Sequence, residues 1–84
     1  MKRLRLLLAD DHETVRAALR LLLETKSDVD IVADVADGVS AVDAASAFEP
    51  DVAVLDVAMP KMNGLAATRA IKQRTPHVAV VALT

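Results

Sequence analysis

Residues 52–56 read Val52-Ala53-Val54-Leu55-Asp56, a short apolar run that ends in a carboxylate. A second run, Leu6-Leu7-Leu8-Ala9, ends in the acidic pair Asp10-Asp11. Apolar runs of this length, closed by turn residues, indicate strands that are buried on both faces, as in a parallel sheet. In such sheets, ligands bind beyond the carboxyl ends of the strands. If the two strands are neighbours, three carboxylates converge there.

Converging carboxylates need a counter-charge. Two unit charges about 4 Å apart repel by about 4 kcal/mol at an effective dielectric near 20. A divalent cation bound between them would remove that repulsion.

Four apolar runs alternate with segments of helical length, which predicts the order βαβαβαβ. The expected strands are Leu4–Ala9, Val29–Ala36, Val52–Leu55 and Val78–Leu83. Right-handed crossovers between them give a parallel sheet with helices on both faces. We therefore expect an α/β protein with a doubly wound parallel sheet, and one domain over residues 1–84.

The first helical segment carries an apolar stripe with the spacing i, i+3, i+4, i+7, i+8. The stripe consists of Val15, Ala18, Leu19, Leu22 and Leu23. It predicts an amphipathic helix that packs this stripe on the sheet. Arg16, Arg20 and Glu24 are expected on the opposite, polar face.

The other two helices are recognised mainly by where they begin and end. The second is expected to begin near Gly38, with Ser40 as a possible cap, and to end before Pro50. The third is expected to begin around Gly64 and to end before Pro76.

The composition of the chain excludes several classes of protein. The net charge is -2 and the ten basic residues are scattered, so this chain by itself is not expected to bind nucleic acid. The sequence has no cysteine, which excludes disulfides and thiolate sites and suits a reducing compartment. Residues 1–9 imitate a signal peptide, but the apolar stretch ends too early at Asp10. Since no apolar run approaches the ~20 residues of a membrane span, we expect a cytoplasmic protein without membrane contact.

The last expected strand, Val78–Leu83, has the pattern of a buried strand, yet the sequence ends at Thr84. An apolar edge strand in water pairs readily with another chain. We therefore expect a homo-oligomer, and the alternative is a monomer that tolerates the open edge.

Several motifs are weak evidence singly but indicate a family when they occur together. Acids after a strand, such as Asp10-Asp11, often start a turn and cap the next helix. Asp56, in contrast, is followed by the turn-rich segment Met59-Pro60-Lys61-Met62-Asn63-Gly64 and then by a helix. With Thr84 at the end of the next strand, these features resemble the receiver domain of bacterial two-component response regulators, most like the LuxR/NarL type. The resemblance runs from Leu4 to Thr84 and implies the flavodoxin-like receiver fold.

The resemblance also implies roles for individual residues. Asp56 would be the phosphoacceptor, taking a phosphoryl group from the phosphohistidine of a sensor histidine kinase or from a small donor such as acetyl phosphate. Asp11 would ligate Mg²⁺ directly and Asp10 would help to hold it, often through water. A carboxylate oxygen of Asp56 and the backbone carbonyl of Ala58 would complete the protein ligands. Thr84 would be the switch hydroxyl, and the parent protein would be a transcription regulator.

The sequence departs from the family at its end. A complete receiver has five strands and five helices, so this chain is expected to lack the last helix, strand and helix. The missing strand carries the family's lysine, and Lys61 is not expected to replace it. The uncovered sheet face and the exposed last strand are the expected oligomer contacts.

Three functions remain open from the sequence. The first is phosphoryl acceptance in signalling, which would make the chain a signalling domain rather than an enzyme. The second is a phosphorylation-independent dimerisation or interaction module. The third is a Mg²⁺-dependent phosphohydrolase with Asp56 as nucleophile, disfavoured because Ala58 stands where such enzymes usually have a second aspartate. We interpret His12 as a surface residue rather than a metal-binding or phosphorelay residue, and His77, before a strand and beside Pro76, as a turn residue. Met59 and Met62 are interpreted as loop packing.

Overall fold

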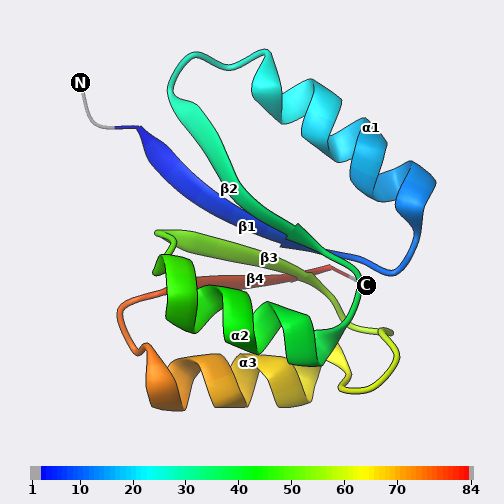
Figure 1. Ribbon diagram of the computed structural model, residues 1–84, viewed down its shortest axis with the longest axis vertical. Helices are drawn as coiled ribbons and strands as arrows, with labels where there is room; N and C mark the ends of the chain where they lie inside the picture. Colours follow the sequence, from blue (N-terminus) through cyan, green and yellow to red (C-terminus); the bar gives the residue numbers. More distant parts are fainter. Residues whose placement is uncertain (1–2, 84) are drawn as a thin grey trace.

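The structure is a computed structural model and describes residues 3–83. The strands are β1 (Leu4–Ala9), β2 (Val29–Val35), β3 (Val52–Asp56) and β4 (Ala79–Leu83), and the helices are α1 (Glu13–Glu24), α2 (Gly38–Phe48) and α3 (Gly64–Arg74). All strand pairs are parallel, in the order β2-β1-β3-β4 (Figure 1). The expected βαβαβαβ order and doubly wound sheet are therefore confirmed. Thr84, the expected switch residue, lies outside the described residues.

The core lies between the sheet and the pair of helices α2 and α3. Alternate strand residues, such as Leu7 and Leu55, point into it and are 0% exposed. Burying a leucine side chain contributes about 1.5–3 kcal/mol, so each of these residues stabilises the sheet substantially. Where α2 and α3 meet the sheet, the buried side chains are mostly small, among them Ala41, Ala45 and Ala67. Small side chains allow the two helices to pack close to each other and to the strands.

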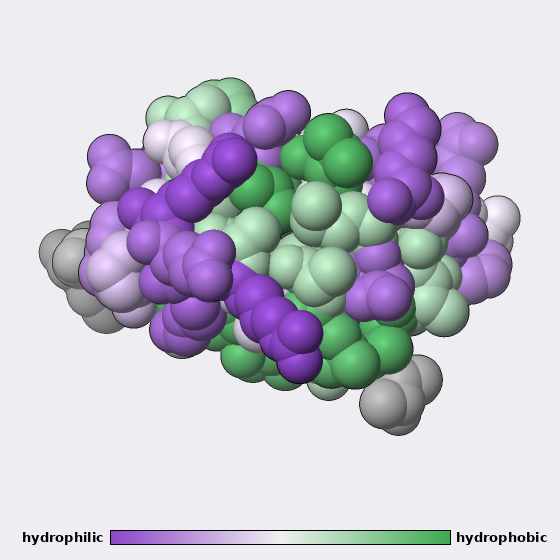
Figure 2. Space-filling view, turned by 90° about the horizontal axis from the view of Figure 1, so that it is seen from below, coloured by the Kyte–Doolittle hydropathy of each residue, from purple (hydrophilic) through white to green (hydrophobic). Residues whose placement is uncertain are grey.

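The two faces of the sheet are covered unequally. Helices α2 and α3 lie together on one face, and α1 lies alone on the other, next to β2 (Figure 1). Seen from the side of α2 and α3, hydrophobic residues remain open to solvent among hydrophilic ones (Figure 2). The exposed ones on these two helices include Val39, Phe48 and Leu65. Within residues 3–83, no second helix lies beside α1 over β3 and β4.

The predicted packing of α1 is partly wrong. No residue of this helix is buried, and Val15 and Leu22 of the apolar stripe are 45% and 66% exposed. The supposedly outward Arg16 instead turns to the sheet, where its Nε meets the Oδ1 atom of Asp34 in β2, and Arg20 Nη1 lies 3.2 Å from the other oxygen of Asp34. The physical reason is that α1 covers only the β2 side of this face. Part of the apolar stripe therefore overhangs strands that the helix does not reach.

The helix ends follow ordinary capping chemistry, with one correction. The N-cap of α2 is Asp37, whose Oδ1 accepts a hydrogen bond from the backbone N–H of Ser40 at 2.8 Å. Ser40 was expected as a possible cap, but it supplies the donor and the acid supplies the acceptor. Asn63 caps α3 in the same way, accepting from Ala66 N at 2.9 Å. As predicted, these helices end before Pro50 and Pro76.

Strand β4 is less buried than its sequence suggests. Val78, just before the strand, is 0% exposed, but Val81 and Leu83 are 47% and 40% exposed. The apolar pattern is that of a central strand, whereas β4 lies at the edge of the described sheet.

None of the helices within residues 3–83 is long and apolar enough to cross a membrane.

Candidate functional site

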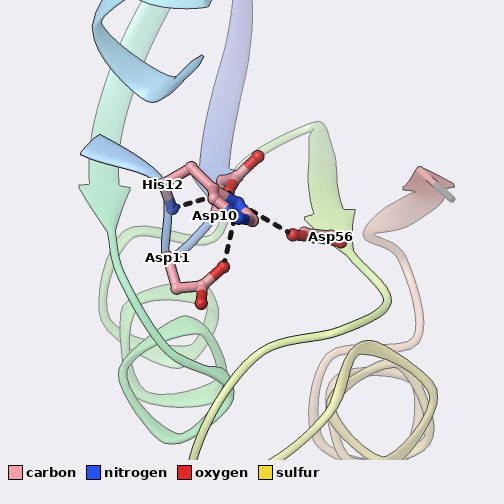
Figure 3. A group of neighbouring side chains, drawn as sticks. All are labelled: Asp10, Asp11, His12 and Asp56. Carbon is pink, nitrogen blue, oxygen red and sulfur yellow. Dashed lines mark hydrogen bonds and ion pairs between the residues drawn. The ribbon is translucent and has the colours of Figure 1, made fainter. Parts of the chain in front are cut away.

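The carboxyl ends of β1 and β3 lie side by side because these strands pair directly, with Ala9 opposite Leu55. Asp10 directly follows β1 and Asp56 is the last residue of β3. One ligand atom from each of Asp10, Asp11, His12 and Asp56 lies within 4.8 Å of the others (Figure 3). The structure therefore brings the three carboxylates together at the expected edge. We call these four residues the acidic cluster.

Asp10 is the buried member of the acidic cluster, with 8% of its surface exposed. Its backbone N–H donates to Val35 O at 3.1 Å, which anchors it to β2. Its Oδ1 atom accepts from the backbone N–H of His12 at 2.8 Å and lies 2.8 Å from His12 Nδ1. Burial alone raises the pKa of Asp10, but the hydrogen bonds and positive charge of His12 outweigh it and hold the pKa below its usual value.

His12 joins the acidic cluster, although the sequence favoured a surface residue over a metal-binding one. Its Nδ1 atom lies 3.1 Å from Asp11 Oδ1 and 3.7 Å from Asp56 Oδ2, besides its contact with Asp10. Its side chain is 64% exposed, so the surface assignment is correct but incomplete. The hydrogen bond with Asp10 and the charges of Asp11 and Asp10 raise the pKa of His12. The available signal was its position directly after the acidic pair.

Asp56 is held so that its two oxygens differ. Oδ1 accepts a hydrogen bond from the backbone N–H of Ala58 at 3.1 Å, while Oδ2 faces His12. The side chain is 16% exposed, so it is largely shielded from solvent but still accessible. Its backbone is closely packed, because a Cβ added at Gly64 would lie 2.4 Å from Asp56 O. The structure thus places Asp56 and Ala58 where the sequence expects them, and their roles stay predictions.

The loop between β3 and α3 is fastened to the start of α2. Lys61 Nζ lies 3.6 Å from Asp37 Oδ2. The Lys61 backbone has a φ angle of 67°, in the left-handed region. A Cβ added at Gly38 would lie 1.8 Å from Met62 O, so only glycine permits this approach. Lys61 therefore pairs away from the acidic cluster. Met59 is buried at 7% exposed, in agreement with its expected packing role.

The acidic cluster has the chemistry of a divalent cation site. Carboxylate oxygens that leave positions for water are the ligands that Mg²⁺ prefers. Asp10 is buried, and a buried negative charge requires a partner. Within the described part of the chain, the only ion pairs of these three carboxylates are those with His12. The residues present therefore fit a Mg²⁺ ion held by Asp10, Asp11 and Asp56.

Known proteins resemble this chain in sequence over nearly its whole length. A family model described as "Response regulator receiver domain" matches residues 6–84. The chain is 37% identical over 82 residues to the transcriptional regulatory protein DegU of Brevibacillus brevis, and the match covers 98% of this chain and 35% of DegU. It is 37% identical over 81 residues to the response regulator protein VraR of Staphylococcus saprophyticus, covering 96% of this chain and 39% of VraR.

Solved structures give the same picture. The signal receiver domain of NarL from Mycobacterium tuberculosis superposes with a TM-score of 0.93 and 29% identity, covering 98% of this chain and 66% of that one. The response regulator domain of Thermotoga maritima CheB has a TM-score of 0.87 and 32% identity, covering 96% of this chain and 61% of that one. The chain thus spans only part of each of these proteins.

Proposed function

Because this chain belongs to the response regulator receiver domain family, we propose that it accepts a phosphoryl group on Asp56 from the phosphohistidine of a sensor histidine kinase. The resemblance drawn from the sequence is confirmed by the family match over residues 6–84. Its relatives DegU and VraR are named as regulators. We further propose that the whole protein to which this domain belongs regulates transcription.

One observation carries the proposal: Asp56 stands at the carboxyl end of a central strand, next to two further carboxylates. Its Oδ1 accepts a hydrogen bond from Ala58 N, which leaves Oδ2 as the oxygen that faces the other members of the acidic cluster. An aspartate held in this way is fixed in orientation, and fixed orientation lowers the barrier to attack. A carboxylate is also an established covalent nucleophile towards phosphorus.

In the proposed reaction, an oxygen of Asp56 forms a bond to phosphorus while the P–N bond to the donor imidazole breaks. The departing nitrogen takes up a proton, and an acyl phosphate remains on Asp56. Asp10 and Asp11 would hold Mg²⁺ beside Asp56, and the Ala58 carbonyl would complete the protein ligands. When bound, the ion offsets the charge on the phosphoryl oxygens that the anionic nucleophile must approach.

Intact-mass spectrometry after incubation with acetyl phosphate and Mg²⁺ tests the proposal. We expect a single phosphoryl mass increment in the wild type and none in Asp56→Asn. Asp51→Asn is a matched control, because Asp51 precedes the same strand and its carboxylate accepts from Arg5 N at 2.9 Å, away from the acidic cluster. An increment that persists in Asp56→Asn, or its absence from a folded wild type, would contradict the proposal.

A second candidate function is a phosphorylation-independent interaction module, and we propose that its partner is a second copy of this chain. The supporting observation is the open edge of β4, with Val81 and Leu83 exposed on an apolar strand. The pairing of Lys61 with Asp37 supports it further, because this lysine is not directed at Asp56. Dimerisation and phosphoryl acceptance use different surfaces, so the mass experiment and a size measurement test them separately.

A further inference from the structure

Arg16 is a largely shielded charge on α1 that lies outside the acidic cluster. Its side chain is only 18% exposed, although arginine is mostly an exposed residue. Its Nε atom meets Asp34 Oδ1 of β2, and both atoms are shielded from solvent. This ion pair accounts for one end of the guanidinium, and the other end makes a separate contact.

The second contact of Arg16 is with the backbone of the acidic cluster. Its Nη1 atom donates a hydrogen bond to Asp10 O at 2.7 Å. Asp10 lies beyond the pairing of β1 with β2, which ends where Ala9 stands opposite Val35. Its N–H still reaches Val35 O at 3.1 Å, but its carbonyl takes its donor from α1. The Asp10 backbone is therefore fixed on one side by β2 and on the other by Arg16.

The carbonyl of Asp10 belongs to the peptide group that leads into Asp11. Because a peptide group is planar, holding its oxygen also fixes the direction of the Asp11 N–H and Cα. The two residues joined by this peptide group carry the carboxylates that converge with Asp56, and one ligand atom of each lies within 4.8 Å of the others. A tilt of the peptide group would therefore move the Asp11 carboxylate relative to Asp56.

The shape of the guanidinium suits this double contact. Its donors lie in one rigid plane, so an Nε atom anchored on Asp34 sets the direction of Nη1. Arg20 offers a comparison on the same helix, because its Nη1 lies 3.2 Å from the other oxygen of Asp34. Within residues 3–83, the ion pairs of Arg20 are with Asp34 and Glu24, and the bond to Asp10 comes from Arg16. The two arginines thus share a helix and an acidic partner but differ in the contact with Asp10.

We propose that Arg16 is a positioning residue for phosphoryl acceptance, which acts through the Asp10 carbonyl to hold the peptide group between Asp10 and Asp11. Arg16 acts from outside the acidic cluster, so it affects the geometry of the carboxylates rather than a reacting atom. Such geometry matters, since a misplacement of about 1 Å can cost about a hundredfold in rate. The effect on the rate rests on the proposed function, whereas the orientation of the peptide group does not.

Phosphorylation rates of three arginine variants test the inference. The rate of the phosphoryl mass increment with acetyl phosphate and Mg²⁺ is measured for the wild type, Arg16→Met, Arg16→Lys and Arg20→Met, and is divided by the folded fraction from urea denaturation. We expect Arg16→Met to be about tenfold to a hundredfold slower, as for the loss of an orienting partner, and Arg20→Met to keep the wild-type rate. Arg16→Lys keeps the positive charge, but a single ammonium cannot reproduce the planar fork, so it should remain about tenfold slow.

A spectroscopic measurement does not require phosphoryl transfer. In ¹H–¹⁵N spectra, the backbone amide of Asp11 should shift in Arg16→Met, because its peptide group loses the hydrogen bond to Arg16, and should stay in place in Arg20→Met. An unmoved Asp11 amide, or equal rates for Arg16→Met and Arg20→Met, would overturn the inference. Full recovery of the rate in Arg16→Lys would also overturn it, because charge without the planar fork would then suffice.

The test separates this inference from folding defects and from the proposed function. If Arg16→Met does not fold, Arg16→Lys and Arg20→Met carry the same comparison of rates and of the Asp11 amide. A wild type without a mass increment would refute the proposed function and the effect of Arg16 on its rate. The Asp11 amide would then decide by itself whether Arg16 fixes the peptide group.

Discussion

Gly64 is the residue at which the site and the helix after it come closest together. A Cβ at this position would lie 2.4 Å from Asp56 O and 2.7 Å from Val57 Cα, both of them backbone atoms that cannot swing aside. We expect Gly64→Ala to lower the free energy of unfolding by about 1–3 kcal/mol, as overpacking usually does. It should also slow phosphoryl acceptance, because the clash pushes on Asp56 itself. Urea denaturation and the acetyl phosphate mass assay check both effects.

The next residue provides the control for that substitution. Leu65 lies in the same first turn of α3 but is 60% exposed. Leu65→Ala should therefore change the free energy of unfolding by no more than about 0.5 kcal/mol. Equal destabilisation by the two substitutions would show that the first turn of α3, and not the close approach at Gly64, is sensitive.

The raised pKa of His12 gives a prediction about pH. The protonated ring stabilises the fold in full below its unfolded pKa of about 6.5, and this contribution is lost as the pH rises through the higher folded pKa. We expect Asp10→Asn to lower the pKa of His12, because the hydrogen bond with Asp10 is the main cause of the shift. An NMR titration of the His12 ring measures it, and an unchanged pKa in the variant would refute this cause.

At the residue scale, the sequence predicted the acids better than it predicted their neighbour. Asp10, Asp11 and Asp56 could be placed together because each follows an apolar run, and parallel strands align their carboxyl ends. The position of the His12 ring depends on a side-chain rotation within a turn. That rotation is set by contacts with the neighbouring carboxylates of Asp10 and Asp11 and with Asp56 of β3, and propensity for helix or strand does not report such side-chain contacts.

Among the elements, α1 and β2 are joined by a charged contact that propensity does not reveal. Arg16 Nε meets Asp34 Oδ1, and both atoms are shielded from solvent, while Arg16 Nη1 donates to Asp10 O at 2.7 Å. A double-mutant cycle with Arg16→Met and Asp34→Ala should give a coupling energy of about 0.5–3 kcal/mol. The unfolding free energies of the four proteins provide this value.

The control cycle uses a pair on the same helix. Arg20 Nε and Glu24 Oε1 are 3.3 Å apart, one helical turn along α1, and their side chains are 40% and 53% exposed. Exposed pairs of this kind are worth about 0.3–0.5 kcal/mol. If both cycles gave the same small coupling, the contact between Arg16 and Asp34 would add nothing to the packing of α1.

The elements themselves were largely predictable. The strand runs and the proline and glycine boundaries of α2 and α3 place each end within about two residues, since they depend on local chemistry. The packing face of α1 was not predictable, because apolar periodicity shows that a face is apolar but does not show how much sheet lies beneath it. Val15 and Leu22 consequently remain exposed, while Arg16 finds a partner.

At the scale of the whole sheet, β4 lies at the edge of the strands formed by residues 3–83, and the proposed pairing through this edge predicts self-association of the 84-residue chain. Val81 points to the α1 face, since its neighbour Val80 packs on the opposite core, and it is 47% exposed. We expect the wild type to elute at a larger size as its concentration increases, and Val81→Lys to shift it towards the monomer, because a lysine on an edge strand opposes pairing. Size exclusion with light scattering measures this.

A second apolar-to-lysine change separates the edge from general solubility. Leu65→Lys also replaces an exposed apolar residue by lysine, but on α3, on the other side of the sheet. It should leave the association unchanged. A wild type that stays monomeric at all concentrations, or equal effects of the two lysines, would contradict pairing through β4.

The central place of β1 in the sheet has a consequence for synthesis on the ribosome. One neighbour of β1 is β2, the next strand made, but the other is β3, and the bond from Arg5 N to the side chain of Asp51 spans 46 positions. At about 5–20 residues per second, roughly 2 to 9 s pass between translation of these two residues. During that time the nascent chain carries β1 with one row of backbone groups unpaired. The pairing of β1 is therefore completed only after β3 has emerged.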